Sequence, residues 1–341
     1  MTSTLPVHPD IAQLRRRAKE LLRDAKAGDS AALERLARVL TDPPAATLSD
    51  AQTVLAREHG FASWPKLRAA VAELTQLQPD FGAAQPLFRN KTAGESLFTA
   101  DVFIEGALNA GWEPGPLPDA LVFTFHAIYA HLLAGDSRFE RNTRLAPSNS
   151  TMFTTIADGP RVGVTCLSPG ATAMVGQVEN QIALGGATRF VIVGTAGSIL
   201  PDVKVGDVVV VTSAVRDDGI SQHYLPPDTY VDADDVLATA LATALKEHGV
   251  DATLGSTWTV PTPYRSTADE VEQLAMDGVA VVECEVASLL AVAEARGVAA
   301  GACLSVVSSL IAHDRAVTLV PADPAAVLEA ALSVLGVPPR R

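Results

Sequence analysis

The sequence predicts an α/β protein whose sheet is flanked by helices and preceded by a small all-α domain. Beyond about residue 93, apolar strand-like runs alternate with amphipathic helical runs, which favours parallel pairing with helices on the faces of the sheet. The first 78 residues show helical periodicity only. Hydrophobic residues make up 48 % and charged residues 19 % of the chain, which excludes a disordered chain. The length of 341 residues is enough for about two domains.

Residues 1–78 predict four amphipathic helices. The first places Leu14 and Leu21 on one face and basic residues on the other. Ser49 and Ser63 stand where they can cap the third and fourth helices. The expected helices cover about residues 11–27, 31–40, 49–60 and 63–74.

The acidic charge balance excludes general nucleic-acid binding. Lys and Arg number 26 against 39 Asp and Glu, a net charge of -13. The first 78 residues hold 11 basic and 9 acidic residues, a net of +2, so residues 79–341 carry -15. Phosphate backbones repel such a chain, and a small-molecule substrate is the better expectation.

Cysteine and histidine spacing predicts neither disulfides nor a metal site. The three cysteines are far apart and form no CxxC pair, and the seven histidines show no HxH or HExxH spacing. We expect no cofactor and a reducing, cytoplasmic environment. The chain opens with no segment typical of a signal peptide, and no charge-free stretch reaches the length of a membrane span.

Pro79, Gly82 and Pro86 predict a linker over residues 79–92, which leaves residues 93–341 as the second domain. The expected strands cover residues 121–125, 161–167, 189–194, 207–213, 253–260, 279–283 and 299–307. The expected helices cover residues 171–184, 236–248, 267–276, 284–296 and 324–335. Ligands of α/β sheets bind outside the carboxyl ends of the strands, so the residues just after these strands are the candidates.

A glycine-rich string follows the expected strand 189–194. Gly194 and Gly197 flank Thr195, and such a turn can point backbone N–H groups at one anion. The alternative is an ordinary turn without a ligand.

Two carboxylates separated by one residue follow the expected strand 279–283. Glu283 and Glu285, on either side of Cys284, are costly to bury without partners. Vicinal sugar hydroxyls are natural partners, because an ionised carboxylate accepts from both. The alternative is that Glu285 only occupies the first turn of the next helix, where the dipole favours it.

Together these strings resemble the nucleoside phosphorylase family. The two strings are RFVIVGTAGSILPDVKVGDVVVVTSAVRDDGISQHYLPPD and VAVVECEVASLLAVAEARGVAAGACLSVVSS. The family includes uridine phosphorylase, hexameric purine nucleoside phosphorylases and methylthioadenosine nucleosidases, and residues 215–224 look closest to the uridine branch. The resemblance covers roughly residues 95–340. It implies a nucleoside-phosphorylase-like mixed sheet flanked by helices, and a homo-oligomer, a dimer or a hexamer.

The resemblance also implies roles for the candidate residues. Glu285 would hold the ribose hydroxyls, with Cys284 packed on the sugar and Glu283 beside it. Thr195, with the backbone of Gly194, would face the attacking phosphate or water.

The phosphate side departs from the family pattern. The loop after the first strand, residues 124–129, lacks the family's arginine, Ile192 stands at a second such position, and none occurs near residues 149–151. Arg138, Arg141 and Arg144 either substitute or form a solvated face. His126 is the nearest general base by sequence; its alternative is a structural role.

The base side departs as well. Ser309 stands where purine-cleaving relatives carry an acid, and Tyr264 or Arg265 could contact a base. His313 and Asp314 replace the acid only if their loop folds back.

Two functions therefore remain open. The first is cleavage of the N-glycosidic bond of a ribonucleoside, with phosphate or water as acceptor. The second is a silent nucleoside-binding module coupled to the N-terminal helices. Those helices, IAQLRRRAKELLRDAKAGD and LSDAQTVLAREHGFASWPKLRAAV, resemble a segment that precedes ankyrin-type repeats in bacterial proteins, which implies a protein partner or a docked cap.

Overall fold

A computed structural model describes residues 11–40, 42–77, 92, 94–142, 152–156, 159–311, 317–318 and 320–340. The chain divides into two compact units, Met1–Phe88 and Arg89–Arg341. Nearly all of the expected linker lies outside the described residues.

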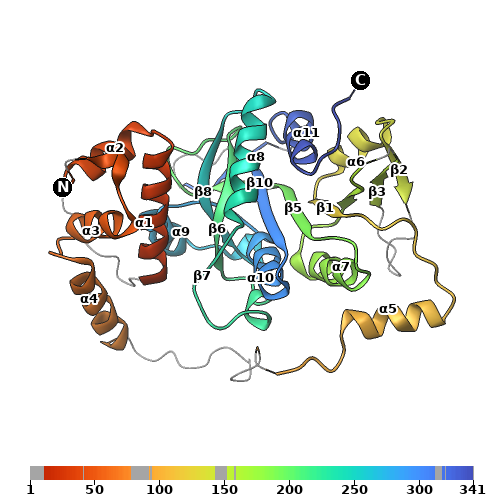
Figure 1. Ribbon diagram of the computed structural model, residues 1–341, viewed down its shortest axis with the longest axis horizontal. Helices are drawn as coiled ribbons and strands as arrows, with labels where there is room; N and C mark the ends of the chain where they lie inside the picture. Colours follow the sequence, from red (N-terminus) through yellow and green to blue (C-terminus); the bar gives the residue numbers. More distant parts are fainter. Residues whose placement is uncertain are drawn as a thin grey trace. The chain divides into compact units, whose positions relative to one another are not determined.

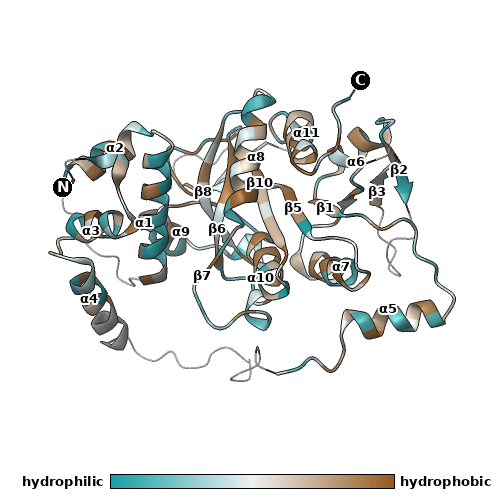
Figure 2. Cartoon of the chain, in the orientation of Figure 1, coloured by the Kyte–Doolittle hydropathy of each residue, from teal (hydrophilic) through white to brown (hydrophobic). Residues whose placement is uncertain are grey.

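The first unit is helical. Leu14, Leu21, Leu36, Leu55 and Leu67 form its core, and the hydropathy colouring of Figure 2 shows the amphipathic character of its first helix. Thr47, and not Ser49, caps the third helix, because Thr47 and Asp50 form a reciprocal capping box. The elements are α1 (Ile11–Lys26), α2 (Ser30–Ala37), η1 (Pro43–Ala45), α3 (Leu48–Glu58) and α4 (Trp64–Leu77).

The second unit has the α/β architecture that the sequence predicts (Figure 1). Its strands are β1 (Ala120–Thr124), β2 (Phe139–Asn142), β3 (Met152–Thr155), β4 (Val162–Cys166), β5 (Arg189–Ser198), β6 (Val208–Arg216), β7 (Tyr230–Asp232), β8 (Ala252–Thr259), β9 (Val279–Glu283) and β10 (Ala299–Ser309). Its helices are α5 (Ala100–Asn109), α6 (Ala127–Ala134), α7 (Ala171–Ala183), η3 (Ser221–His223), α8 (Asp235–Glu247), η4 (Pro263–Arg265), α9 (Ala268–Met276), α10 (Val286–Arg296) and α11 (Pro324–Val334).

Five of the strands close into a ring. β5 pairs with β10, β10 with β6, β6 with β8, β8 with β9, and β9 returns to β5. From β5 the sheet continues outward through β1, β4, β3 and β2. The sheet is mixed: β1, β4, β5 and β10 pair in parallel, whereas β9 runs antiparallel to β5.

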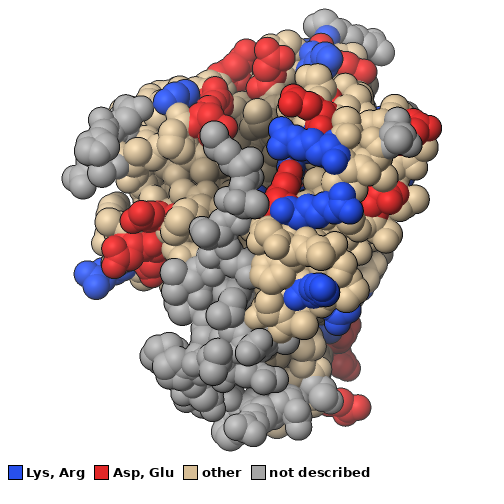
Figure 3. All heavy atoms as spheres, turned by 90° about the vertical axis from the view of Figure 1, so that its left-hand side faces the viewer, with Lys and Arg blue, Asp and Glu red and all other residues tan. Residues whose placement is uncertain are grey.

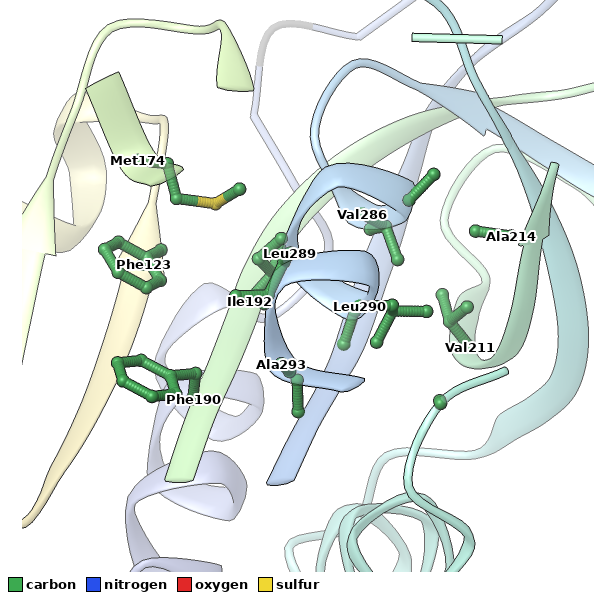
Figure 4. Packing of buried hydrophobic residues seen from close by; sticks show 14 of the residues in the cluster. Phe123, Met174, Phe190, Ile192, Val211, Ala214, Val286, Leu289, Leu290 and Ala293 are labelled. Atoms are coloured by element: carbon green, nitrogen blue, oxygen red, sulfur yellow. The ribbon is translucent and has the colours of Figure 1, made fainter. Parts of the chain in front are cut away.

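Alternation along the strands builds a core on each face. Phe190 and Ile192 of β5 face α7 and α10, while Val191 and Val193 belong to the core that includes residues of α6, α8 and α11. Figure 4 shows Leu289 of α10 beside Ile192 of β5, whereas Leu290 of α10 points toward Val211 of β6. The helix α10 thereby fills the space between these strands and fixes where its first residues lie.

Among the described residues, every helix is too short or too polar to cross a bilayer. On the face shown in Figure 3, basic and acidic side chains lie next to one another. Adjacent opposite charges do not form the extended positive surface that nucleic-acid backbones attract.

Candidate active site

The ends of two strands meet beside β5. β1 pairs with β5 as far as Thr124 opposite Val193, and β9 pairs with β5 from Val282 opposite Gly197. Because β1 runs parallel to β5 and β9 antiparallel, their carboxyl ends approach each other from opposite directions. Residues 194–196 of β5 lie between them, at the kind of switch in strand order where ligands of such sheets bind.

The glycine-rich string is a strand, and the expectation of a turn is wrong. β5 continues to Ser198, and residues 194–198 pair with β10, with Thr195 opposite Ser305. Their backbone is used in the ladder, so it forms no turn-type cradle of N–H groups. Thr195 is half-buried. It follows Val193 by two residues on the same strand, so its side chain lies on the face of the sheet that packs against α6.

Glycine at these positions permits close packing. A Cβ on Gly197 would lie 2.6 Å from Leu310 Cδ1 and 3.0 Å from Ser308 Oγ. A Cβ on Gly194 would lie 3.2 Å from Leu304 Cδ2. Glycine at positions 194 and 197 therefore lets β10 and the segment after it pack closely against β5.

Glu285 lies at the beginnings of two helices. It is the N-cap residue of α10, and its Oε1 accepts a 2.6 Å hydrogen bond from the N–H of Gly170, the N-cap residue of α7. The residue is only 6 % exposed. Burial raises the pKa of its carboxyl, whereas the N–H groups of Gly170 and Cys284 lower it. Two helix N-termini favour an anion here.

Glu283 has its acceptors filled from within the chain. Oε1 accepts from the Thr259 hydroxyl at 2.5 Å and lies 3.2 Å from the Thr257 hydroxyl. Oε2 accepts the backbone N–H groups of Glu285 and Val286 at 2.6 and 2.8 Å. Burial and then the charge of Glu285 raise the pKa of Glu283 to about 7.

Cys284, between them, is half-buried and packs against the cluster of Trp258 and Val282. Burial, then the charges of Glu285 and Glu283, raise the pKa of its thiol to about 12. The thiol therefore stays protonated and acts as an apolar contact.

His126 begins α6. Its Nδ1 accepts the N–H of Ile128 at 3.2 Å, which makes it the N-cap residue of that helix. In a neutral imidazole whose Nδ1 accepts a hydrogen bond, the hydrogen is on Nε2.

The candidates for base contact follow two different strands, Tyr264 and Arg265 after β8 and Ser309 at the end of β10. Tyr264, in η4, is 96 % exposed, and Arg265 beside it is exposed as well. Ser309 ends β10, where its Oγ accepts the N–H of Ile311 at 3.3 Å. His313 and Asp314 lie outside the described residues, as do Arg144 and residues 149–151.

The three arginines proposed as substitutes differ. Arg138 is neither solvated nor available: it pairs with Asp136 at 2.6 Å and with Glu329 at 2.5 Å, and its side chain is 11 % exposed. Arg141 lines a cavity of about 800 Å³ together with His126. The cavity begins directly after β1 and β4.

Sequence reasoning missed the residues that hold the site together. Gly170, Thr257 and Thr259 supply donors to the two glutamates. Asp218 accepts hydrogen bonds from the hydroxyls of Ser221 and Ser288, and so ties the segment after β6 to the first turn of α10. In the sequence, Thr257, Thr259 and Asp218 are polar residues in or just after expected strands. Their partners are distant in sequence, so the contacts could not be predicted.

A family model described as the phosphorylase superfamily matches residues 125–335, more than half of the chain. The chain belongs to the phosphorylase superfamily. A purine nucleoside phosphorylase DeoD-type of Exiguobacterium sibiricum is 34 % identical over 149 residues, 41 % of this chain and 60 % of that protein. A uridine phosphorylase of Salmonella typhimurium is 34 % identical over 158 residues, 42 % of this chain and 62 % of that protein.

The matches thus span about 60 % of the length of these curated relatives. A purine nucleoside phosphorylase from Toxoplasma gondii, solved in complex with immucillin-H, shares the fold of this superfamily member with a TM-score of 0.55. That likeness covers 64 % of this chain and 88 % of that structure at 21 % identity. The family model begins at residue 125, and the likeness of the N-terminal helices to an ankyrin-associated segment stays a prediction.

Proposed function

We propose that this protein cleaves the N-glycosidic bond of a ribonucleoside. The observation that carries the proposal is the difference between its two adjacent buried carboxylates. Glu283 is filled by donors of the chain, whereas the carboxylate of Glu285 has only the N–H groups of Gly170 and Cys284 among the described residues. A carboxylate offers about four acceptor positions, so Glu285 has room for two hydroxyl donors.

Glu285 would hold the vicinal hydroxyls of the ribose. Its buried position strengthens such bonds, because the local dielectric is low. Cys284 would pack on the sugar. Glu283 would act as a positioning residue, because it fixes the backbone N–H groups of Glu285 and Val286 without touching substrate.

The reaction breaks the bond between C1′ and the base nitrogen, and the base leaves with the bonding electrons and takes up a proton. The acceptor oxygen forms the new bond to C1′ and loses its proton when the acceptor is water. Thr195, between the ends of β1 and β9, would face this acceptor. His126, which begins α6 directly after β1, would lie on the acceptor side of the site.

On the base side, Tyr264 and Arg265 would contact the departing base, with Ser309 nearby in place of an acid. The exposure of Tyr264 leaves its ring available for stacking. Both purine and pyrimidine relatives match this chain at 34 % identity, so the substrate class we propose is a ribonucleoside of either kind. Assembly as a homo-oligomer and a cytoplasmic location belong to the same proposal.

The test is release of free base from a panel of purine and pyrimidine nucleosides, with and without phosphate. We expect Glu285→Gln to abolish release while Glu272→Gln, an exposed change on α9, leaves it intact. Release that needs phosphate makes the protein a phosphorylase, and release without phosphate makes it a nucleosidase.

A second function is favoured by Arg138 and Ile192. Arg138 is held in ion pairs and Ile192 is apolar, so neither supplies the charged donors that a phosphate acceptor needs. A silent nucleoside-binding module, coupled to a partner of the N-terminal helices, would show nucleoside-induced thermal stabilisation without base release from any nucleoside.

A further inference from the structure

The first turn of α10 is capped by a neighbouring strand and not by its own N-cap residue. Glu285 is that N-cap residue, yet its side chain makes no capping hydrogen bond to the helix. An N-cap side chain ordinarily accepts the N–H of the second or third helical residue. In α10 the second residue is Ala287, and its N–H is donated to the hydroxyl of Thr259 at 2.9 Å. A side chain of β8 thus performs the capping that Glu285 does not.

The other donors of this turn also go to residues outside the helix. The backbone N–H groups of Glu285 and Val286 are donated to Oε2 of Glu283, the last residue of β9. The hydroxyl of Ser288 is donated to Asp218, which follows the end of β6 by two residues. Each of these donors therefore has an acceptor other than the carboxylate of Glu285.

The hydroxyl of Thr259 is held from two sides. Thr259 is fully buried and lies opposite Glu283 in the parallel pairing of β8 with β9. Its hydroxyl donates to Oε1 of Glu283 at 2.5 Å. Because a hydroxyl has one hydrogen and two acceptor positions, this bond turns the acceptor side of the oxygen toward the N–H of Ala287.

Thr257 offers a natural comparison with Thr259. It lies two residues earlier on β8, is equally buried, and its hydroxyl is 3.2 Å from the same Oε1 of Glu283. Its other contact among the described residues is the backbone oxygen of Val281 at 3.3 Å, so it serves β9 and no N–H of α10. The two threonines thereby separate support of Glu283 from capping of α10.

Loss of the Thr259 hydroxyl has a specific consequence for Glu285. The N–H of Ala287 would be left buried without its acceptor, which is costly. A carboxylate at the N-cap position is attracted both by such a donor and by the helix dipole. A carboxylate that turns to cap its own helix has one acceptor position fewer for a ligand.

We propose that Thr259 is a positioning residue for sugar binding. By accepting the N–H of Ala287, it keeps that donor away from Glu285 and leaves the carboxylate free for two vicinal hydroxyls. This role rests on the proposed function, which puts the ribose at Glu285. Thr259 itself touches no substrate, since its hydroxyl is used by Glu283 and Ala287.

The experiment compares full-length wild type with four variants. Thr259→Val removes the hydroxyl at nearly constant volume, and Thr259→Ser retains it. Thr257→Val removes the other hydroxyl beside Glu283, and Thr239→Val makes the same change at an exposed site on α8. Calorimetric titration in phosphate-free buffer uses inosine, uridine and the 2′-deoxy form of each. Base release is measured on the same samples.

The ratio of ribonucleoside to 2′-deoxynucleoside affinity is the decisive quantity. Wild type should prefer the ribonucleoside about tenfold, the effect of one charge-assisted hydrogen bond. Thr259→Val should remove most of this preference, because its Glu285 retains an acceptor for only one hydroxyl. Thr259→Ser should restore the preference, and Thr257→Val should keep it even where both affinities fall. A merely structural defect weakens both ligands alike and leaves the ratio unchanged.

A second measurement needs no ligand. The amide signal of Gly170, followed by NMR of protein labelled with ¹⁵N-glycine, reports the hydrogen bond that this N–H donates to Glu285. We expect the signal to shift in Thr259→Val, because Glu285 turns toward its own helix, and to stay in place in Thr259→Ser and Thr239→Val. Thr259→Cys, whose thiol is a weak donor and acceptor, replaces the valine variant if that protein does not fold.

A wild-type ribose preference in folded Thr259→Val or Thr259→Cys overturns the proposal. If wild type binds no nucleoside, an unshifted Gly170 signal in the same variant overturns it. Failure of the proposed function is distinguishable, because it appears as absence of base release by wild type from every nucleoside, while the Gly170 shift in Thr259→Val persists.

Discussion

Glu283 accepts the backbone N–H of Glu285 at 2.6 Å, so one acidic side chain fixes the backbone from which the other projects. The second N–H that it accepts, from Val286, is the first of α10. Replacing the carboxylate therefore alters the position of Glu285 without removing any atom that we expect to touch substrate.

We predict that Glu283→Gln raises KM for a nucleoside about tenfold. The carboxylate accepts hydrogen bonds through two oxygens, whereas the amide has only one acceptor oxygen and loses part of these bonds. Its kcat should fall less than that of Glu285→Gln. Steady-state kinetics on both variants, with Glu272→Gln alongside, checks this. A normal KM in a folded Glu283→Gln protein would show that Glu283 positions nothing.

The contribution of Glu283 to stability should fall as pH rises between 4.5 and about 7. Burial and the repulsion between the two carboxylates raise the pKa of Glu283 to about 7 from 4.5. The folded protein then binds the proton more tightly than the unfolded chain in this window, and stability is lost as it dissociates. The Tm of wild type minus that of Glu283→Gln, followed from pH 4.5 to 7.5, should decrease. A rising difference contradicts the raised pKa.

Asp136→Asn should destabilise the fold by about 3 kcal/mol, because it leaves the partly buried Arg138 with half of its ion pairs. The Asp136 side chain is 1 % exposed and also lies 3.1 Å from Arg340 Nε. Urea denaturation at pH 7 measures the change. Glu34→Gln, in the exposed pair with Arg38, should cost less than about 0.5 kcal/mol.

Two glycine substitutions should have opposite signs. A Cβ on Gly186 would lie 2.7 Å from the backbone oxygen of Pro118, which cannot move aside, so Gly186→Ala should cost about 1–3 kcal/mol. A Cβ on Gly176, inside α7, meets nothing within 4 Å, so Gly176→Ala should stabilise by roughly 0.5–1 kcal/mol. Thermal unfolding of both variants compares them, and a stable Gly186→Ala protein would contradict the close approach.

The apolar strands and amphipathic helices were predictable because burial imposes their periodicity. All seven expected strands and all five expected helices of the second unit are confirmed, although β5 and β6 run further than expected. The structure adds β2, β3, β7, α5 and α6. β2 has only four residues, two of them charged, and α6 is apolar on nearly all sides, so neither carries the pattern of a half-buried element.

The site was predictable in residue type but not in geometry. The two glutamates stood out because carboxylates at strand ends are rare without a reason. Their difference in hydrogen bonding could not be foreseen, because Thr257, Thr259 and Gly170 reach them from other strands. The string around Thr195 contains turn residues, yet pairing with β10 outweighs that local preference. Arg138 looked solvated because Glu329, its partner, lies 191 residues away in sequence.

Ring closure also limits how copies of this chain can aggregate. Exposed strand edges template the addition of further strands, and a strand with neighbours on both sides offers no such edge. Within the described part of the second unit, β2 and β7 each pair on one side only. β2 carries Glu140 and Arg141 exposed at its centre, and such charges oppose strand addition. The apolar strands of the ring stay protected from intermolecular pairing as long as the ring is closed.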